Sequence, residues 1–155
     1  MGSSAGEEQA VSDNAEVRPA VEGWFVDGDP PRLIGLRCEQ CATVVFPPRA
    51  LACPNPACDA TELASAELSS TGRVWSFATN HYPPPAPAVA PDPFVPYTVA
   101  AVELETEAMV VLGQMTGDLE GLRVGSPVEL VIETLFEDDE ARHLVHKWRL
   151  IPEAV

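Results

Sequence analysis

The stretch "LRCEQCATVVFPPRALACPNPACDA", residues 36–60, holds all the cysteines of the chain. The first pair, Cys38 and Cys41, is spaced C-x-x-C, and the second pair, Cys53 and Cys58, is spaced C-x-x-x-x-C. Two turns that each present two thiolates supply the four ligands of a tetrahedral zinc ion. The residues between the pairs are of β type around a Pro-Pro turn, as in the hairpin of a zinc ribbon. The spacing therefore predicts a zinc site.

Two other uses of these cysteines are open. A thioredoxin-like redox centre needs one C-x-x-C in a βαβ unit, and the second pair has no role in it. Disulfides need an oxidising compartment. The N-terminal "MGSSAGEEQAVSDNAE" has neither the basic nor the apolar region of a secretion signal, so we expect a cytoplasmic protein with reduced thiols. Zinc is favoured, and a site closed by four sulfurs is structural because no position is left for water.

The segment before the cysteines predicts a tail and a short helix. Residues 1–16 are polar and without periodicity, which is typical of a disordered acidic tail. Val21, Trp24 and Phe25 then follow the i, i+3, i+4 spacing of an amphipathic helix. We expect this N-terminal helix and its turn over residues 17–35, and the zinc ribbon over 36–68.

After the ribbon the chain becomes rich in β-type residues. Apolar and polar residues alternate with period two, and turn-forming segments separate the runs, which predicts half-buried strands. Five such strands in a short segment favour a closed barrel of the OB type over residues 69–155. The fold class is thus mainly β: a short N-terminal helix, a zinc ribbon and a five-stranded OB-fold barrel. The predicted strands are "GRVWSFATNH" (72–81), "YTVAAVELE" (97–105), "AMVVLGQM" (108–115), "PVELVIETLF" (127–136) and "RHLVHKWRLI" (142–151).

The charge of the chain argues against nucleic acid as a partner. The sequence has 24 acidic and 9 basic residues and a net charge of −15. Ribbons and OB folds often bind nucleic acid, but an acidic surface repels the phosphate backbone, and it repels anionic membranes as well. An OB-type binder of single-stranded nucleic acid is therefore only an alternative, and we expect neither nucleic-acid nor membrane binding.

The order of motifs resembles a known family. "GWF" (23–25) precedes the cysteine block, "STGRVWSFATNH" (70–81) follows it, and then come "FVPYTVAAVELE" (94–105), "GQMTG" (113–117), "GLRVGSPVEL" (121–130) and "RLIP" (149–152). Over about residues 17–152 the chain resembles the acyl-CoA-associated family with a rubredoxin-like zinc ribbon and a C-terminal OB fold, long catalogued as a domain of unknown function. The spacing of Cys53 and Cys58 is wider than the usual C-x-x-C of that family.

The resemblance implies a function in a complex. Members of this family pair with thiolase-fold enzymes that act on acyl-CoA thioesters, in archaeal thiolase assemblies and in actinobacterial sterol side-chain degradation. It implies a hetero-oligomer with a thiolase-like, sterol-carrier-type enzyme, and a retro-aldolase is the expected partner. It also implies that this chain helps to form the acyl-CoA channel of the partner. The Ala-, Pro- and Val-rich composition favours the actinobacterial setting.

The chain shows no nucleophile or phosphate-binding motif, and its cysteines are assigned to metal, so we expect no catalytic residue of its own. His146 falls on the apolar face of the last strand and is expected in the core, whereas His143 is expected in solvent. His81 opens a proline-rich loop, "YPPPAPAVAPDPFVPY" (82–97), which is either a stiff connector or a docking or tunnel-lining surface. His81, Phe94 and Tyr97 are the candidate partner or channel residues.

A stand-alone acyl-CoA binder is the remaining alternative. It would have to hold the CoA phosphates with arginines. The candidates Arg32, Arg37, Arg49 and Arg73 are scattered along the sequence.

Overall fold

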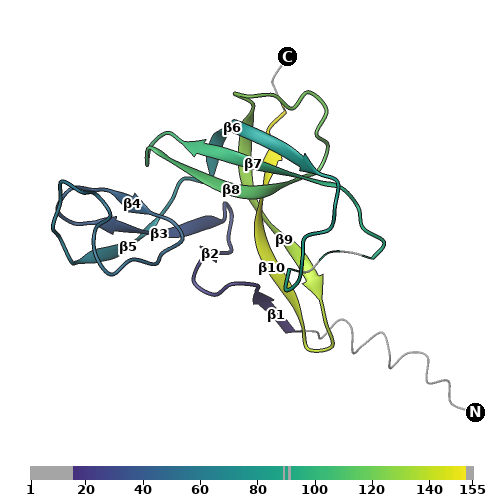
Figure 1. Cartoon of the computed structure of the whole chain (residues 1–155), viewed down its shortest axis with the longest axis horizontal. Coiled ribbons are helices and arrows are strands. Elements are labelled where there is room, and N and C mark those ends of the chain that lie inside the picture. Colours follow the sequence, from purple (N-terminus) through teal and green to yellow (C-terminus); the bar gives the residue numbers. More distant parts are fainter. Residues whose placement is uncertain (1–15, 89, 91, 153–155) are drawn as a thin grey trace, which may run out of the picture.

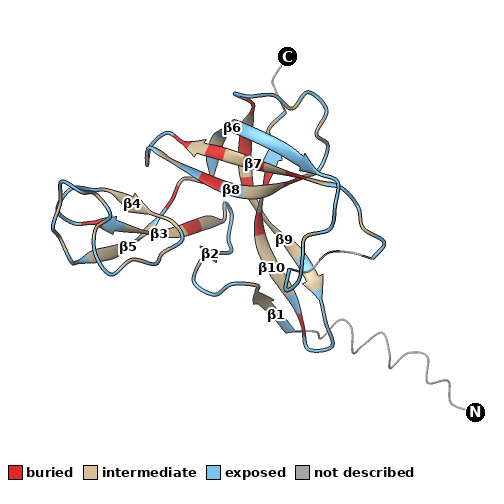
Figure 2. Cartoon of the chain, in the orientation of Figure 1, coloured by how far each residue is buried: buried red, intermediate tan, exposed pale blue. Residues whose placement is uncertain are grey.

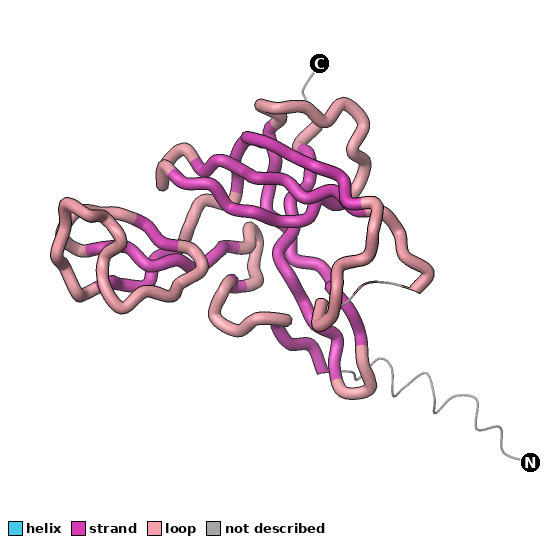
Figure 3. Tube along the Cα trace, viewed as in Figure 1, coloured by secondary structure: helices cyan, strands magenta, loops and turns pink. Residues whose placement is uncertain are grey.

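The computed structural model describes residues 16–88, 90 and 92–152, and these fold into strands and loops without a helix (Figure 3). Figure 1 shows a ribbon region and a barrel side by side. The strands are β1 (Glu16–Pro19), β2 (Phe25–Val26), β3 (Arg32–Cys38), β4 (Val44–Val45), β5 (Leu63–Glu67), β6 (Thr71–Asn80), β7 (Tyr97–Leu104), β8 (Met109–Thr116), β9 (Pro127–Glu137) and β10 (Ala141–Leu150).

The barrel is a closed ring of five strands. Pairing runs β6–β7–β8–β10–β9 and returns from β9 to β6, with only the β8–β10 pair parallel. This is the strand order of an OB fold, and it confirms the predicted fold class of a five-stranded barrel after a ribbon. Each predicted barrel strand is present, and β6, β7, β8, β9 and β10 begin and end within one residue of the predicted bounds.

The barrel core is built from the inward residues of these strands. Along β7 the burial alternates strictly, with Thr98, Ala100, Val102 and Leu104 buried. Trp148 of β10 is fully buried, and its indole occupies the space that a side chain at Gly113 would need, since a Cβ there would lie 2.8 Å from Trp148 Cδ1. Figure 2 shows the buried residues concentrated where the barrel strands cross. The core therefore depends on shape matching between β8 and β10.

The ribbon is a small antiparallel sheet in which β3 lies centrally. β3 pairs with β2 through Phe25 and Leu33, and with β4 and β5. Leu33 of β3 and Leu68, directly after β5, are both fully buried and belong to the same hydrophobic cluster as the barrel residues. The ribbon therefore packs onto the barrel through shared core residues. The predicted division between residues 68 and 69 stays a prediction.

The predicted N-terminal helix is wrong. The segment instead forms β1, which runs parallel to β10 with Pro19 opposite Leu144, and β2, which pairs with β3. Gly23, between β1 and β2, has φ +85°, which is outside the helical region. Glycine also lowers the stability of a helix, whereas pairing with β10 and β3 gives the backbone of this segment hydrogen-bond partners. Most of the predicted tail, residues 1–15, lies outside the described residues.

Candidate functional site

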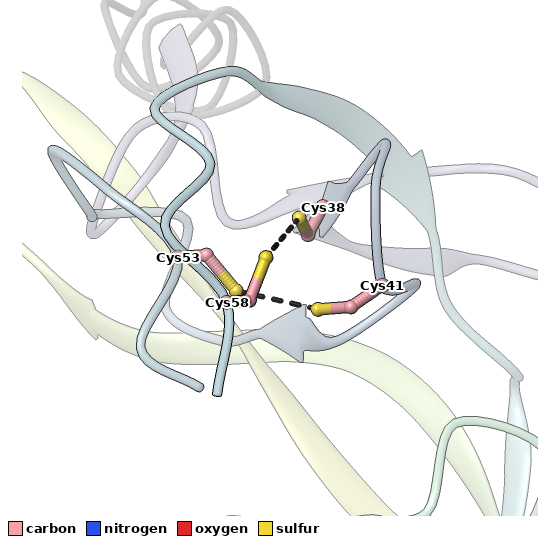
Figure 4. Close-up of side chains that lie close together, drawn as sticks. All are labelled: Cys38, Cys41, Cys53 and Cys58. Atoms are coloured by element: carbon pink, nitrogen blue, oxygen red, sulfur yellow. Dashed lines mark hydrogen bonds between the residues drawn. The ribbon is translucent and has the colours of Figure 1, made fainter. Parts of the chain in front are cut away.

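The four cysteines, which form two pairs along residues 38–58, come together in the ribbon. Cys38 ends β3, Cys41 follows on the next turn, and Cys53 and Cys58 lie on the loop between β4 and β5 (Figure 4). All four Sγ atoms lie within 4.8 Å of one another. Cys38 is buried, Cys53 and Cys58 are half-buried, and Cys41 is exposed.

The spacing of the sulfurs fits a tetrahedral ion. With zinc–sulfur bonds of about 2.3 Å, two ligands at the tetrahedral angle lie about 3.8 Å apart. Cys38 Sγ and Cys58 Sγ are 3.8 Å apart, and Cys41 Sγ and Cys53 Sγ are 3.5 Å apart. No two of these thiols are joined in a disulfide. The four cysteines are thus arranged for metal binding, and together they would hold a structural zinc.

Tight turns of the backbone hold each sulfur in place. In the first turn the N–H of Ala42 donates to the carbonyl of Cys38, and the N–H of Gln40 donates to Cys38 Sγ at 3.4 Å. In the second, the N–H of Cys58 donates to the carbonyl of Asn55, whose side-chain amide in turn donates to Cys41 Sγ at 3.7 Å. N–H groups directed at sulfur stabilise its anionic form, the form that binds metal.

Two of the four thiols have pKa values shifted in opposite directions. Hydrogen bonds from Thr43, first from its hydroxyl and then from its backbone N–H, lower the pKa of Cys41 to about 6. At Cys58 the backbone N–H of Ala60 lowers the pKa, but burial and the neighbouring thiols outweigh it and raise the pKa to about 12. Four thiolates this close repel one another, and a divalent cation between them removes that penalty. The donor set is therefore suited to a cation.

An aromatic cluster joins the ribbon to the barrel. Trp24, before β2, packs edge-on against Phe46 of the ribbon at 5.3 Å between ring centroids. Both rings contact His146 of β10, at 6.2 and 5.9 Å. His146 is buried as predicted, its Nε2 lies 3.0 Å from the carbonyl oxygen of Leu112, and burial lowers its pKa. Sequence reasoning missed this three-way contact, although the "GWF" motif marked Trp24.

A second feature is an apolar recess of about 680 Å³ between the proline-rich loop and the barrel. The loop contributes Val95, Pro96 and Tyr97, and strands β8, β9 and β10 contribute the opposite wall. The volume lies within the usual range for small-molecule sites, and most of the lining is apolar. The strand residues of this wall are Gln114, Met115, Leu135, Phe136 and Lys147.

The structure brings two of the three predicted channel residues together. The rings of Phe94 and Tyr97 meet edge to face at 6.1 Å, and Tyr97 lines the recess. Both side chains are half-buried, whereas His81 is exposed and does not line the recess. Sequence reasoning missed the barrel wall of the recess because Leu135 and Lys147 look like ordinary alternating strand residues.

The remaining histidine lies at the β9–β10 hairpin. His143 Nε2 is 2.8 Å from Asp138 Oδ2, and its ring stacks on Phe136 at 4.2 Å. The His143 side chain is only 15% exposed, so the prediction that it lies in solvent is wrong. Phe136, its direct cross-strand partner on β9, covers the ring. Asp138 lies in the turn between β9 and β10, and hydrogen bonds from the Ala141 N–H and then from His143 lower its pKa to about 2.

Fold and cysteine cluster together define a zinc-ribbon protein with an appended OB-fold barrel. Two family models match in this order: "ChsH2, rubredoxin-like zinc ribbon domain" over residues 26–64 and "ChsH2, C-terminal OB-fold domain" over residues 65–133. A "DUF35 domain-containing scaffold protein" of Methanocaldococcus jannaschii is 32% identical over 124 residues, which are 77% of this chain and 81% of the relative. The chain therefore belongs to the DUF35 family, with the ChsH2-type zinc ribbon and OB-fold domain.

Two further similarities involve subunits of enzymes. "Benzoylsuccinyl-CoA thiolase subunit BbsA" of Thauera aromatica is 28% identical over 126 residues, 81% of either chain. The solved structure titled "Ltp2-ChsH2(DUF35) aldolase" superimposes with a TM-score of 0.56 and 31% identity, over 77% of this chain and 84% of that one. Within the described ranges, no helix of the chain is long and apolar enough to cross a membrane.

Proposed function

We propose that this chain is a non-catalytic accessory subunit that binds a thiolase-fold enzyme acting on acyl-CoA thioesters. The observation that carries the proposal is that one architecture, ribbon plus barrel, is similar across most of its length to a scaffold protein, a thiolase subunit and a subunit of an aldolase complex. The reaction itself belongs to the partner. Retro-aldol cleavage of a steroid side-chain thioester is the reaction we favour, because one of the similar solved structures is an aldolase.

The ribbon supports this role as a rigid element. In the proposal Cys38, Cys41, Cys53 and Cys58 bind one zinc ion, which fixes two loops that have little apolar core of their own. With four sulfur ligands the ion has no open position, so it stiffens the scaffold and takes no part in the reaction. Free thiols in such a cluster suit the reducing cytoplasm, where we place the complex.

The recess supports the proposal that this chain forms part of the acyl-CoA channel of the complex. Its proline-rich wall is stiff before any ligand arrives, which reduces the entropy lost on binding. The rings of Phe94 and Tyr97 contact each other in this wall, and Lys147, whose Nζ lies 3.5 Å from Glu133 Oε1, adds a cation to the lining. An acyl chain with a polar end matches this mixture of apolar lining and one charged group. We propose that the recess accommodates part of the acyl-CoA bound to the complex.

Co-expression tests the accessory role. The full chain carrying an affinity tag is produced together with a thiolase-like protein of the same organism, and the mass of the purified assembly is measured by light scattering. We expect a stable hetero-oligomer, and acyl-CoA turnover that falls at least tenfold when the partner is purified alone. Full turnover by the partner alone, with no complex on the column, would show that the proposal is wrong.

A further inference from the structure

The outer face of three barrel strands exposes large apolar side chains. Trp75 of β6 is 60% exposed, and Leu112 and Val110 of β8 are 64% and 42% exposed. The strand between them, β7, presents Val99 and Ala101 on the same side, because its buried residues alternate with these. An exposed Trp within a contiguous apolar patch is typical of an interface rather than of a free surface.

Strand register makes these side chains neighbours. Ala101 pairs with Leu112 on one side and with Ser76 on the other, directly after the register shift at Trp75. Val110 lies opposite Glu103 on the next outward row. Trp75, Val99, Ala101, Val110 and Leu112 therefore form one continuous patch, called here the β6–β8 face.

The edge of this face is also unprotected. Residues 75–80 of β6 are all exposed, as the pale blue strand in Figure 2 shows, and β9 pairs only with residues 71–73. Natural edge strands usually carry charges or prolines that discourage pairing. The segment "WSFATN" has neither. A long edge without such protection is expected where another chain covers it.

The charge around the β6–β8 face indicates what kind of chain covers it. The rim of the face carries Glu103 and Glu105 beside Arg73, whose Nε lies 3.7 Å from Glu105 Oε1. A second copy would bring these acidic rims and two net charges of −15 together, which is unfavourable. A different protein with an apolar centre and a basic rim is complementary to it.

The face also continues into the recess. Gln114 pairs with Val99 at the border of the β6–β8 face, and it lines the recess. A protein docked on Leu112 and Val99 would therefore reach the mouth of the recess. This continuity favours a partner that delivers a ligand there.

We propose that the β6–β8 face is the surface by which this chain docks on its enzyme partner, a protein with a basic rim around an apolar patch. The inference rests on the proposed function, because it identifies where the accessory subunit makes its contact. Trp75 and Leu112 are the central contacts, and the free edge of β6 is available for main-chain pairing with the partner.

Two substitutions and a matched control test the face. Trp75→Ser and Leu112→Lys remove apolar contacts from its centre, and Leu51→Ser changes a 98% exposed leucine on the ribbon. The purified thiolase-like protein of the co-expression experiment is the probe, and its affinity for each tagged full chain is measured by calorimetry. We expect at least tenfold weaker binding for both face variants, wild-type affinity for Leu51→Ser, and weaker binding of the wild-type chain as salt increases.

Each outcome decides between the proposals. No binding by the wild-type chain would overturn the accessory function and this inference together. Wild-type binding that both face variants retain within twofold would overturn the docking surface alone. A wild-type homodimer that Leu112→Lys dissociates would identify a second copy as the occupant and also overturn it. Circular dichroism shows whether each variant is folded. If Trp75→Ser does not fold, the affinity of Leu112→Lys alone tests the docking surface.

Discussion

The ribbon and the barrel are held together by different means. The barrel has a continuous core, in which Val74, Val102, Leu104, Val128 and Trp148 are nearly or fully inaccessible. In the ribbon the two fully buried leucines, Leu33 and Leu68, belong to the same cluster as the barrel residues, and Val44, Val45 and Phe46 are half-buried. A segment this small cannot bury enough apolar area to fold by packing alone. The comparison indicates that metal binding replaces a core in the ribbon.

The largest expected effect comes from removing the metal site. Cys38→Ser, or treatment with a strong chelator, should release the zinc and unfold the ribbon, since structural zinc sites contribute apparent binding free energies of about 10–16 kcal/mol. The barrel should remain folded because its core does not depend on the sulfurs. Mass spectrometry measures the zinc content, and amide NMR spectra of the full chain show separately whether the ribbon and the barrel are folded.

Thr43→Val is the matched control for the metal site. It keeps all four sulfurs and removes only the hydroxyl that lies 3.1 Å from Cys41 Sγ. We expect this variant to retain one zinc ion per chain and the amide spectrum of the ribbon. Full zinc content and an unchanged ribbon in Cys38→Ser would contradict the metal's role.

The barrel should respond to loss of packing instead. Trp148→Ala leaves a cavity beside Gly113 and should lower the free energy of unfolding by about 3–5 kcal/mol. Trp75→Ala removes a Trp that is 60% exposed and should change stability far less. Urea unfolding followed by circular dichroism compares the two. Equal losses would show that the outer face, like the core, supports the fold of the isolated chain.

Sequence patterns predicted those parts of the molecule that depend on interactions between residues close together in the sequence. Alternation over 127–136 identified β9, which the structure extends only to Glu137, and cysteine spacing identified the metal cluster. Both signals arise within a few residues, from the two-residue period of a strand and from tight turns.

Contacts between distant segments were beyond these patterns. The parallel pairing of β1 with β10 depends on the position of a strand more than a hundred residues later in the chain, and no feature of "EVRP" indicates it. The recess likewise needs the proline-rich loop to fold back over β9 and β10. His143 is covered by Phe136, its cross-strand partner on β9, and the periodicity of a single strand does not reveal such a pairing.

The smallest effect is expected where ribbon and barrel meet. Burial among Trp24 and Phe46 lowers the pKa of His146 below its ordinary value of 6.5, so the folded state keeps the imidazole neutral. Between the folded pKa and 6.5 the unfolded chain binds more protons than the folded chain, and stability therefore falls as the pH falls. The full contribution is present above pH 6.5, and each unit of depression corresponds to about 1.4 kcal/mol.

His146→Phe sharpens this expectation because it keeps an aromatic ring at the junction and removes the titration. Between pH 7 and pH 5 we expect the wild-type chain to lose more stability than the variant, measured by urea unfolding at each pH. His81→Gln, at an exposed position of the loop, should keep the wild-type dependence. Parallel pH profiles for wild type and His146→Phe would mean that the imidazole can be protonated without separating Trp24 and Phe46 from the barrel, and the junction would then depend on Leu33 and Leu68 instead.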